Sequence, residues 1–176
     1  MRVILLGSGS YSGTPKVLCE CENCSRARRF PQYRRTRFSM YIPKINVLID
    51  PSPDLYYHMS YVNYPALSEG DFPPDELEVK GKRIVITGDT GPEILRNHEL
   101  LEEIQGADLL VSEMTQKYSI PKTHLGVEDA IKFAQKVEAN KTLFVHISHS
   151  NYAHEELEEK VGENGMVGRD FMVLRI

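Results

Sequence analysis

The sequence has no long apolar run, which argues against a protein that crosses a membrane with a helix. No stretch of its 176 residues approaches the roughly 20 apolar residues that a membrane-spanning helix needs. The apolar N-terminal stretch, residues 1–7, is too short for a secretory signal and leads directly into a glycine turn. We therefore expect a cytoplasmic protein with no membrane partner. Internal repeats, low-complexity tracts and heptads are also absent.

The chain also lacks an excess of positive charge. Its 21 lysines and arginines stand against 25 acidic residues, so the net charge is −4 and nothing attracts nucleic acid to the molecule as a whole. Positive charge is instead concentrated within twelve residues, at Arg26, Arg28, Arg29, Arg34, Arg35 and Arg37. Such a run can contact RNA phosphates or form a solvated helix face, and we favour the solvated face.

The composition is otherwise that of an ordinary globular protein, with 41% apolar and 26% charged residues. We expect one domain over residues 1–176. The apolar patterns predict strands at 2–6, 38–42, 45–49, 83–87, 108–112, 142–147 and 171–176, and helices at 92–105, 127–137 and 154–161. A short helix ends at Tyr61, and 63–76 is expected to be a loop. Alternating strands and helices indicate a layered α/β fold.

Only three cysteines are present, and all lie within six residues: Cys19, Cys21 and Cys24. The residues between them are polar, which argues against simple core packing. An odd number of cysteines in a cytosolic protein makes a disulfide unlikely to form. Thiolates at this spacing can hold a tetrahedral zinc ion with a distant histidine as fourth ligand. Reduced free thiols and a redox role are the alternatives.

A second group of candidates follows strand ends. Asp89, in Gly88-Asp89-Thr90, comes after a short apolar strand, where a carboxylate can reach a cleft and bridge metals. The alternative is that it caps a helix. His146 and His149 follow the run Leu143-Phe144-Val145, and two histidines three apart after a strand can serve two different sites.

The other histidines carry a weaker signal. His124 lies in a loop before a helix. His58, His98 and His154 lie on expected helices, where we expect them to be solvated rather than to bind metal.

Together these motifs resemble the metallo-β-lactamase superfamily, and within it the phosphoribosyl cyclic phosphate phosphodiesterase type. The resemblance covers residues 1–57 and about 80–176, in family order. Its motifs are Gly7-Ser8-Gly9, Cys19-Glu20-Cys21-Glu22-Asn23-Cys24, Arg34-Arg35-Thr36-Arg37, Val47-Leu48-Ile49-Asp50, Thr87-Gly88-Asp89-Thr90 and His146-Ile147-Ser148-His149.

The resemblance implies an αββα sandwich and two metal sites. Cys19, Cys21, Cys24 and His149 would bind a structural zinc ion. Asp89 would bridge two catalytic metals, zinc or manganese, and His146 would bind one of them. His124 would lie near the substrate. The implied reaction is attack by metal-activated hydroxide on a phosphodiester.

One part of the family pattern is missing from this sequence. The family's His-x-His-x-Asp-His cluster is absent, and the chain passes from Asp50 through a proline-rich stretch to the Gly-Asp-Thr strand. Of the usual catalytic ligands only Asp89 and His146 remain, and two are too few for a tight dinuclear centre. We therefore expect a reduced metallo-β-lactamase-like sandwich with an incomplete catalytic centre.

Three functional hypotheses follow. The first is a metal-dependent phosphodiesterase that uses Asp89 and His146, helped by another subunit or by His58. The second is a catalytically inactive, zinc-stapled scaffold or binding protein. The third is an RNA-processing relative, because Pro73-Pro74 before Gly81-Lys82-Arg83-Ile84 resembles the tRNA 3′-end endonuclease branch.

The sequence also predicts self-association. Four tyrosines cluster where the missing segment would begin, and aromatic residues of this kind suit an interface: Tyr56, Tyr57, Tyr61 and Tyr64. We expect a homodimer, or a higher oligomer, joined through residues 52–75. The alternative is that these tyrosines pack on their own sheet.

Overall fold

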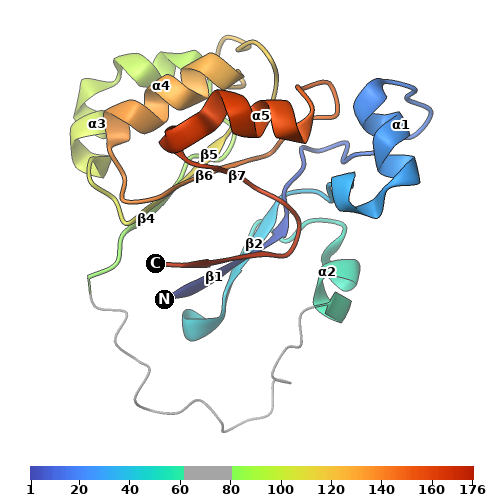
Figure 1. Cartoon of the computed structure of the whole chain (residues 1–176). Helices are drawn as coiled ribbons and strands as arrows, with labels where there is room; N and C mark the ends of the chain where they lie inside the picture. The colour runs from blue at the N-terminus through green and yellow to red at the C-terminus, as the bar shows by residue number, and fades with distance from the viewer. Residues whose placement is uncertain (62–80) are drawn as a thin grey trace, which may run out of the picture.

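Two four-stranded sheets form the centre of the molecule (Figure 1), in a computed structural model that describes residues 1–61 and 81–176. The first sheet is antiparallel, with strand order β3-β2-β1-β8. The second is parallel, with order β4-β5-β6-β7. The strands are β1 (Arg2–Gly7), β2 (Ser39–Ile42), β3 (Val47–Ile49), β4 (Ile84–Ile86), β5 (Leu109–Glu113), β6 (Thr142–Val145), β7 (Met166–Val167) and β8 (Met172–Arg175).

The antiparallel sheet forms because apolar side chains alternate between its two faces. In β1, Val3 and Leu5 belong to the core between the sheets, whereas Ile4 and Leu6 join a smaller cluster on the opposite face. In β2, Met40 faces the same central core as Val3. The main core therefore lies between the two sheets.

The parallel strands are apolar on both faces. Leu109 and Val111 of β5 enter the core between the sheets, and Leu110 packs under the helices. Leu143 and Phe144 of β6 divide in the same way. Burial on both faces explains why these strands read as continuous apolar runs rather than as an alternating pattern.

Three helices, α3, α4 and α5, cover the outer face of the parallel sheet (Figure 1). The helices are α1 (Glu22–Arg29), α2 (Leu55–Tyr61), α3 (His98–Ile104), α4 (Val127–Val137) and α5 (His154–Val161), with 3-10 turns at Pro31–Tyr33, Pro43–Ile45, Pro92–Arg96 and Gly162–Asn164. Among the described residues, no helix is long and apolar enough to cross a membrane.

The expected elements are present, but the structure differs from the expectation in several places. The helix expected over 92–105 is divided into a 3-10 turn and α3, because the side chain of Asn97 accepts a hydrogen bond of 3.2 Å from Leu100 N and starts a new helix. Helix α1 and the two-residue strand β7 were not among the predicted elements, and the strand expected over 45–49 is shortened to Val47–Ile49. The expected loop at 63–76 lies outside the described residues, and the single domain over residues 1–176 stays a prediction.

Candidate metal centres

Three adjacent parallel strands bring candidate ligands to one edge of the second sheet. Asp89 follows β4, Glu113 is the last residue of β5, and His146 comes directly after β6. Ligand sites in sheets of this kind lie at the carboxyl ends of the strands. His124 joins them from the loop after β5, which folds back through a 2.8 Å bond from Ile120 N to His124 O. The candidate ligand atoms of the four residues all lie within 4.8 Å of one another.

Hydrogen bonds determine which nitrogen of His146 is free. The hydroxyl of Thr115 donates to Glu113 Oε2, so its oxygen accepts from Nδ1–H of His146 at 2.9 Å. In the neutral ring Nε2 therefore carries the lone pair, and this nitrogen lies 3.4 Å from Asp89 Oδ1. A metal-binding histidine is oriented in this way, with its second nitrogen donating to a neighbouring group.

Glu113 orients its neighbours through hydrogen bonds, and neither of its carboxylate oxygens is free of such bonds. It is 2% exposed and accepts hydrogen bonds on both carboxylate oxygens, from Thr90 N on one and from Thr115 on the other. His124 Nδ1 lies 2.9 Å from Glu113 Oε2. A carboxylate can only accept, so Nδ1 of His124 carries the proton and Nε2 is left available.

The spacing of Asp89 and His146 fits one shared divalent ion. With metal–ligand bonds of about 2.0–2.2 Å and tetrahedral angles, two ligand atoms on one ion stand roughly 3.3–3.6 Å apart. The observed separation is 3.4 Å. A carboxylate and an imidazole also suit zinc and manganese.

The backbone at this edge is held in the left-handed region. His146 has a φ of 58°, which a residue with a side chain rarely adopts, and Gly88 next to Asp89 has a φ of 57°. Such strain persists where the surrounding structure imposes it, often at functional sites. The conformation turns the chain sharply as it leaves β6.

A cleft of about 480 Å³ opens beside this group, between the ends of the two sheets. Asp89, Glu113 and His146 line one wall, and Arg37 and Asp50 come from the antiparallel side. The floor is apolar and combines Phe38, Ile86, Val111 and Val145. This size and this mixture of an apolar floor with a few polar groups are typical of small-molecule sites.

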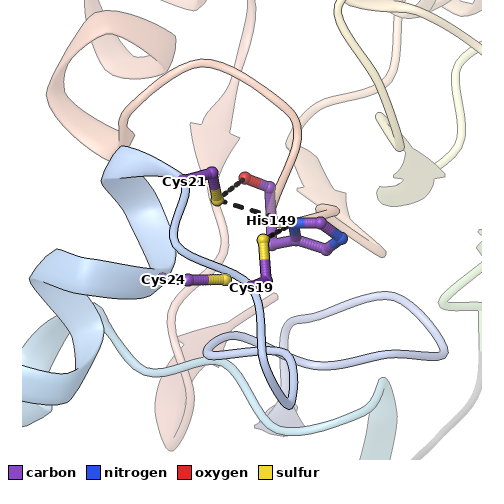
Figure 2. A group of neighbouring side chains, drawn as sticks. All are labelled: Cys19, Cys21, Cys24 and His149. Atoms are coloured by element: carbon purple, nitrogen blue, oxygen red, sulfur yellow. Dashed lines mark hydrogen bonds between the residues drawn. The ribbon is translucent and has the colours of Figure 1, made fainter.

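The cysteine cluster forms a second group of candidate ligands (Figure 2). Cys19 and Cys21 lie before α1, Cys24 lies in α1, and His149 lies in the loop between β6 and α5. His149 Nδ1 is 3.5 Å from Cys19 Sγ and 3.6 Å from Cys21 Sγ. Zinc bonds of about 2.3 Å to sulfur and 2.0–2.1 Å to nitrogen place such atoms about 3.6 Å apart at tetrahedral angles. The donor set therefore fits zinc.

Neighbouring groups hold the cysteine cluster together. Asn23 Nδ2 donates to His149 O at 3.1 Å and to Asn151 O at 2.9 Å, which joins α1 to the loop that carries His149. Burial raises the pKa of the Cys24 thiol to about 11, so this thiol needs a bound cation to ionise at neutral pH. Burial lowers the pKa of His149 and favours the neutral imidazole that a metal requires.

Several expectations about single side chains were wrong. His58 and His154 are buried, not solvated; His98 is exposed as expected. His58 is 0% exposed and contacts Thr36 Oγ1 through Nε2 at 2.7 Å, and it is not part of the Asp89 group. Its burial in α2 was hidden because the polar partners come from distant parts of the chain.

The arginine run does not form one solvated helix face. Arg35 is buried, Arg26 binds Glu155 and Arg37 binds Asp54 at 2.9 Å. Glu113 was not predicted as a site residue. Its signal is its position, because it ends the buried apolar run of β5 just as Asp89 and His146 follow β4 and β6.

Comparisons with known proteins show which family and which fold this chain resembles. A family model described as "Beta-lactamase superfamily domain" matches residues 76–147. A ribonuclease BN from Proteus mirabilis (strain HI4320) is 29% identical over 110 residues, which are 56% of this chain and 34% of that protein. The match thus spans about a third of the relative.

Two solved structures resemble nearly the whole chain. One is a diphosphatase from the PhnP family, with a TM-score of 0.72 and 19% identity, covering 99% of this chain and 97% of that one. The other is Zn²⁺-bound PqqB from Methylobacterium extorquens, with a TM-score of 0.74 and 17% identity, covering 100% of both chains. The chain therefore has the metallo-β-lactamase fold, and the resemblance to the metallo-β-lactamase superfamily that the sequence predicts is confirmed.

Proposed function

We propose that this chain is a metal-dependent hydrolase of phosphodiesters, with its reaction centre at Asp89, Glu113, His124 and His146. The observation that carries the proposal is the placement of Asp89 Oδ1 and His146 Nε2 on the wall of the cleft, 3.4 Å apart. The similarity to a diphosphatase and to a ribonuclease supports a phosphoric ester as the substrate class.

Each residue of this group would have its own role in the reaction. Asp89 and His146 would hold a divalent ion, which supplies an activated hydroxide and stabilises developing negative charge when bound. Thr115 keeps His146 in the tautomer that can bind metal. His124 donates Nδ1–H to Glu113 and keeps Nε2 free, so Nε2 would take a proton from the attacking water and then pass it to the leaving group, while the carboxylate stabilises the imidazolium formed between the two transfers.

We further propose that the catalytic centre is incomplete and therefore weak. The chain has six histidines, and none supplies the dense His-rich cluster of the family. Phosphodiesterase activity is expected to be far below that of a complete centre, because Asp89 and His146 alone hold metal loosely.

The test is hydrolysis of bis(p-nitrophenyl) phosphate with added manganese or zinc. We expect slow metal-dependent turnover that Asp89→Asn removes and Glu113→Gln lowers by about 10–100-fold, the usual cost of losing a residue that orients a metal site. His98→Gln is the control, since this histidine is exposed and outside the cluster. Turnover that survives in Asp89→Asn would place the reaction elsewhere.

A catalytically inactive, zinc-stapled scaffold is the first alternative. The cysteine cluster is separate from the Asp89 group and fits zinc by itself. Metal analysis distinguishes the two proposals. One tightly bound zinc per chain, no binding of a second ion at millimolar manganese, and no turnover favour the scaffold.

An RNA-processing role is the second alternative, and the match to ribonuclease BN supports it. RNA binding through phosphates weakens steeply with salt. Binding of a tRNA precursor that falls between 50 and 200 mM salt, together with its cleavage, is the outcome that favours this role.

A further inference from the structure

A small basic pocket lies apart from the Asp89 group, between the turn Pro31–Tyr33 that follows α1 and the beginning of α5. Four arginines and His154 line it, and no acidic side chain does so among the described residues. The arginines are Arg26, Arg34, Arg35 and Arg169. Figure 1 shows α1 and α5 on the same side of the molecule.

Arg35 is the deepest of these residues, and within residues 1–61 and 81–176 no carboxylate forms an ion pair with its guanidinium. It is 8% exposed, and its guanidinium donates to Ser8 Oγ at 2.8 Å, to Gly168 O and to His154 Nδ1 at 2.6 Å. All three acceptors are neutral groups. Asp170 is joined to the guanidinium only through the hydroxyl of Ser8, and Glu158 acts on it from a distance. Buried arginines are normally paired directly with an anion, so this one can accept a negative partner in contact.

The positive charge around Arg35 is only partly compensated. Arg26 is paired with both oxygens of Glu155, at 2.6 and 2.8 Å. Arg169 is 3.6 Å from Glu158, which also accepts from His154. Arg34 is exposed and donates only to the carbonyl of Ala27, among the contacts of the described residues.

Thr14 adds an unused hydrogen-bonding group to the same pocket. It is 6% exposed, and its hydroxyl has no partner among the described residues. Its backbone is held by bonds of 2.8 and 2.9 Å to Arg35, so the side chain is fixed beside that arginine. A buried hydroxyl without a partner is uncommon, and a ligand that occupies the pocket would provide one.

We propose that this pocket binds a phosphate group. Its volume is about 30 Å³, which holds one or two oxygen-sized atoms. One or two phosphate oxygens would enter beside Arg35 and Thr14, and the others would remain at the open mouth near Arg34 and Arg169. Guanidinium groups suit this oxyanion because their N–H donors match its oxygens in pairs.

Inorganic phosphate and the terminal phosphate of a small phosphorylated ligand present the same oxyanion to this pocket.

The positive field of the pocket also fits the state of His154, whose pKa is lowered to about 4 by burial and by the nearby Arg35 and Arg169. This site is independent of the proposed hydrolysis, because it shares no residue with the Asp89 group.

Calorimetry with inorganic phosphate on the full chain tests the proposal. Sodium chloride at matched ionic strength is the reference, because salt alone screens surface charge. We expect binding at one site, and Arg34→Gln should weaken it about tenfold, the effect of losing one charge-assisted hydrogen bond. Arg29→Gln is the matched control, since it removes the same charge from α1 outside the pocket.

Two further variants decide where the phosphate binds. Thr14→Val should weaken phosphate binding without lowering the melting temperature, since its hydroxyl has no partner to lose. Asp89→Asn should leave phosphate binding unchanged. Binding that is lost in Asp89→Asn but kept in Arg34→Gln overturns the proposal, as does no binding at all. Glycerol 3-phosphate distinguishes the sources: tighter binding than inorganic phosphate identifies a phosphorylated ligand, and weaker binding identifies the free ion.

Discussion

At the scale of single residues, hydrogen bonds determine what each candidate ligand can do. Thr115 donates to Glu113 and thereby accepts from His146, which leaves the lone pair of His146 beside Asp89. The sequence identifies Asp89 and His146 by their positions after apolar strands. It does not show that Glu113 and Thr115, which lie on another strand and the loop after it, determine the protonation of His146.

Substitution of Cys21 tests whether the cysteine cluster binds a structural zinc ion. Purified protein should contain about one tightly bound zinc ion per chain. Cys21→Ser should lose most of it and melt about 5–10 °C lower, since one kcal/mol shifts the midpoint by roughly 2–4 °C at this size. Glu20→Gln, an exposed neighbour in the same loop, should change neither quantity. Unchanged zinc content and stability in Cys21→Ser would rule out the structural zinc.

His154 should make the stability of the folded protein depend on pH. Arg35 donates to its Nδ1, so Nε2 carries the proton and donates to Glu158 at 2.9 Å. Burial lowers its pKa to about 4, below the value of about 6.5 in an unfolded chain. Between these two values the unfolded chain binds more protons, so stability decreases as the pH falls, by up to about 1.4 kcal/mol per pH unit.

Urea unfolding between pH 7 and pH 4.5 measures this dependence. His154→Gln keeps an acceptor for Arg35 and a donor for Glu158 but does not titrate, so its stability should decline less steeply than that of the wild type. His98→Gln should follow the wild type, because His98 is exposed. Parallel curves for His154→Gln and the wild type would show that His154 does not contribute.

At the scale of elements, Asp170 joins three segments that are far apart in the sequence. Its carboxylate accepts bonds from Ser8 N at 2.8 Å, Ser8 Oγ at 2.6 Å, Thr36 N at 2.6 Å and Thr36 Oγ1 at 2.7 Å. The loops after β1, before β2 and before β8 are therefore held at one carboxylate. His58 of α2 completes the group through Thr36.

Replacing Asp170 should loosen this junction. Asp170→Asn turns one acceptor oxygen into a donor that faces other donors, and we expect a loss of about 3 kcal/mol, because hydrogen bonds to charged groups each contribute roughly 1.5–3 kcal/mol. Chemical denaturation measures the difference. Glu163→Gln, exposed in the turn Gly162–Asn164, is the control. A loss of unfolding free energy equal to that of the control would show that Asp170 does not hold these loops together.

At the scale of the whole molecule, the predicted homodimer is still a proposal. Part of the predicted interface, 62–75, including Tyr64, lies outside the described residues. Tyr57 and Tyr61 pack on Phe171 of the same chain, with ring centroids 6.0 and 5.2 Å away, whereas Tyr56 is 92% exposed. His58 is buried and so does not offer a ligand to a second subunit.

Light scattering over a dilution series measures the assembly. We expect the mass of a dimer at micromolar concentration, and Tyr56→Ser should shift it toward the monomer because an exposed aromatic ring at an interface contributes binding energy. Tyr118→Ser is the control, since this tyrosine is also exposed but lies in another region. A monomeric mass at every concentration would contradict the dimer.

The sequence by itself determined the α/β layering, the spacing of Cys19, Cys21 and Cys24, and the positions of Asp89 and His146 after strands. These are local properties, because apolar runs and short-range spacing follow from neighbouring residues. Only the tertiary structure decided that Glu113 and His124 join Asp89, that His58 and His154 are buried, and that Arg35 lies in a pocket whose described lining has no acidic side chain. Apart from the contacts of His154 with Glu158 and of Glu113 with Thr115, the hydrogen-bond partners named for these side chains are more than ten positions away in the chain, and no local pattern encodes such contacts.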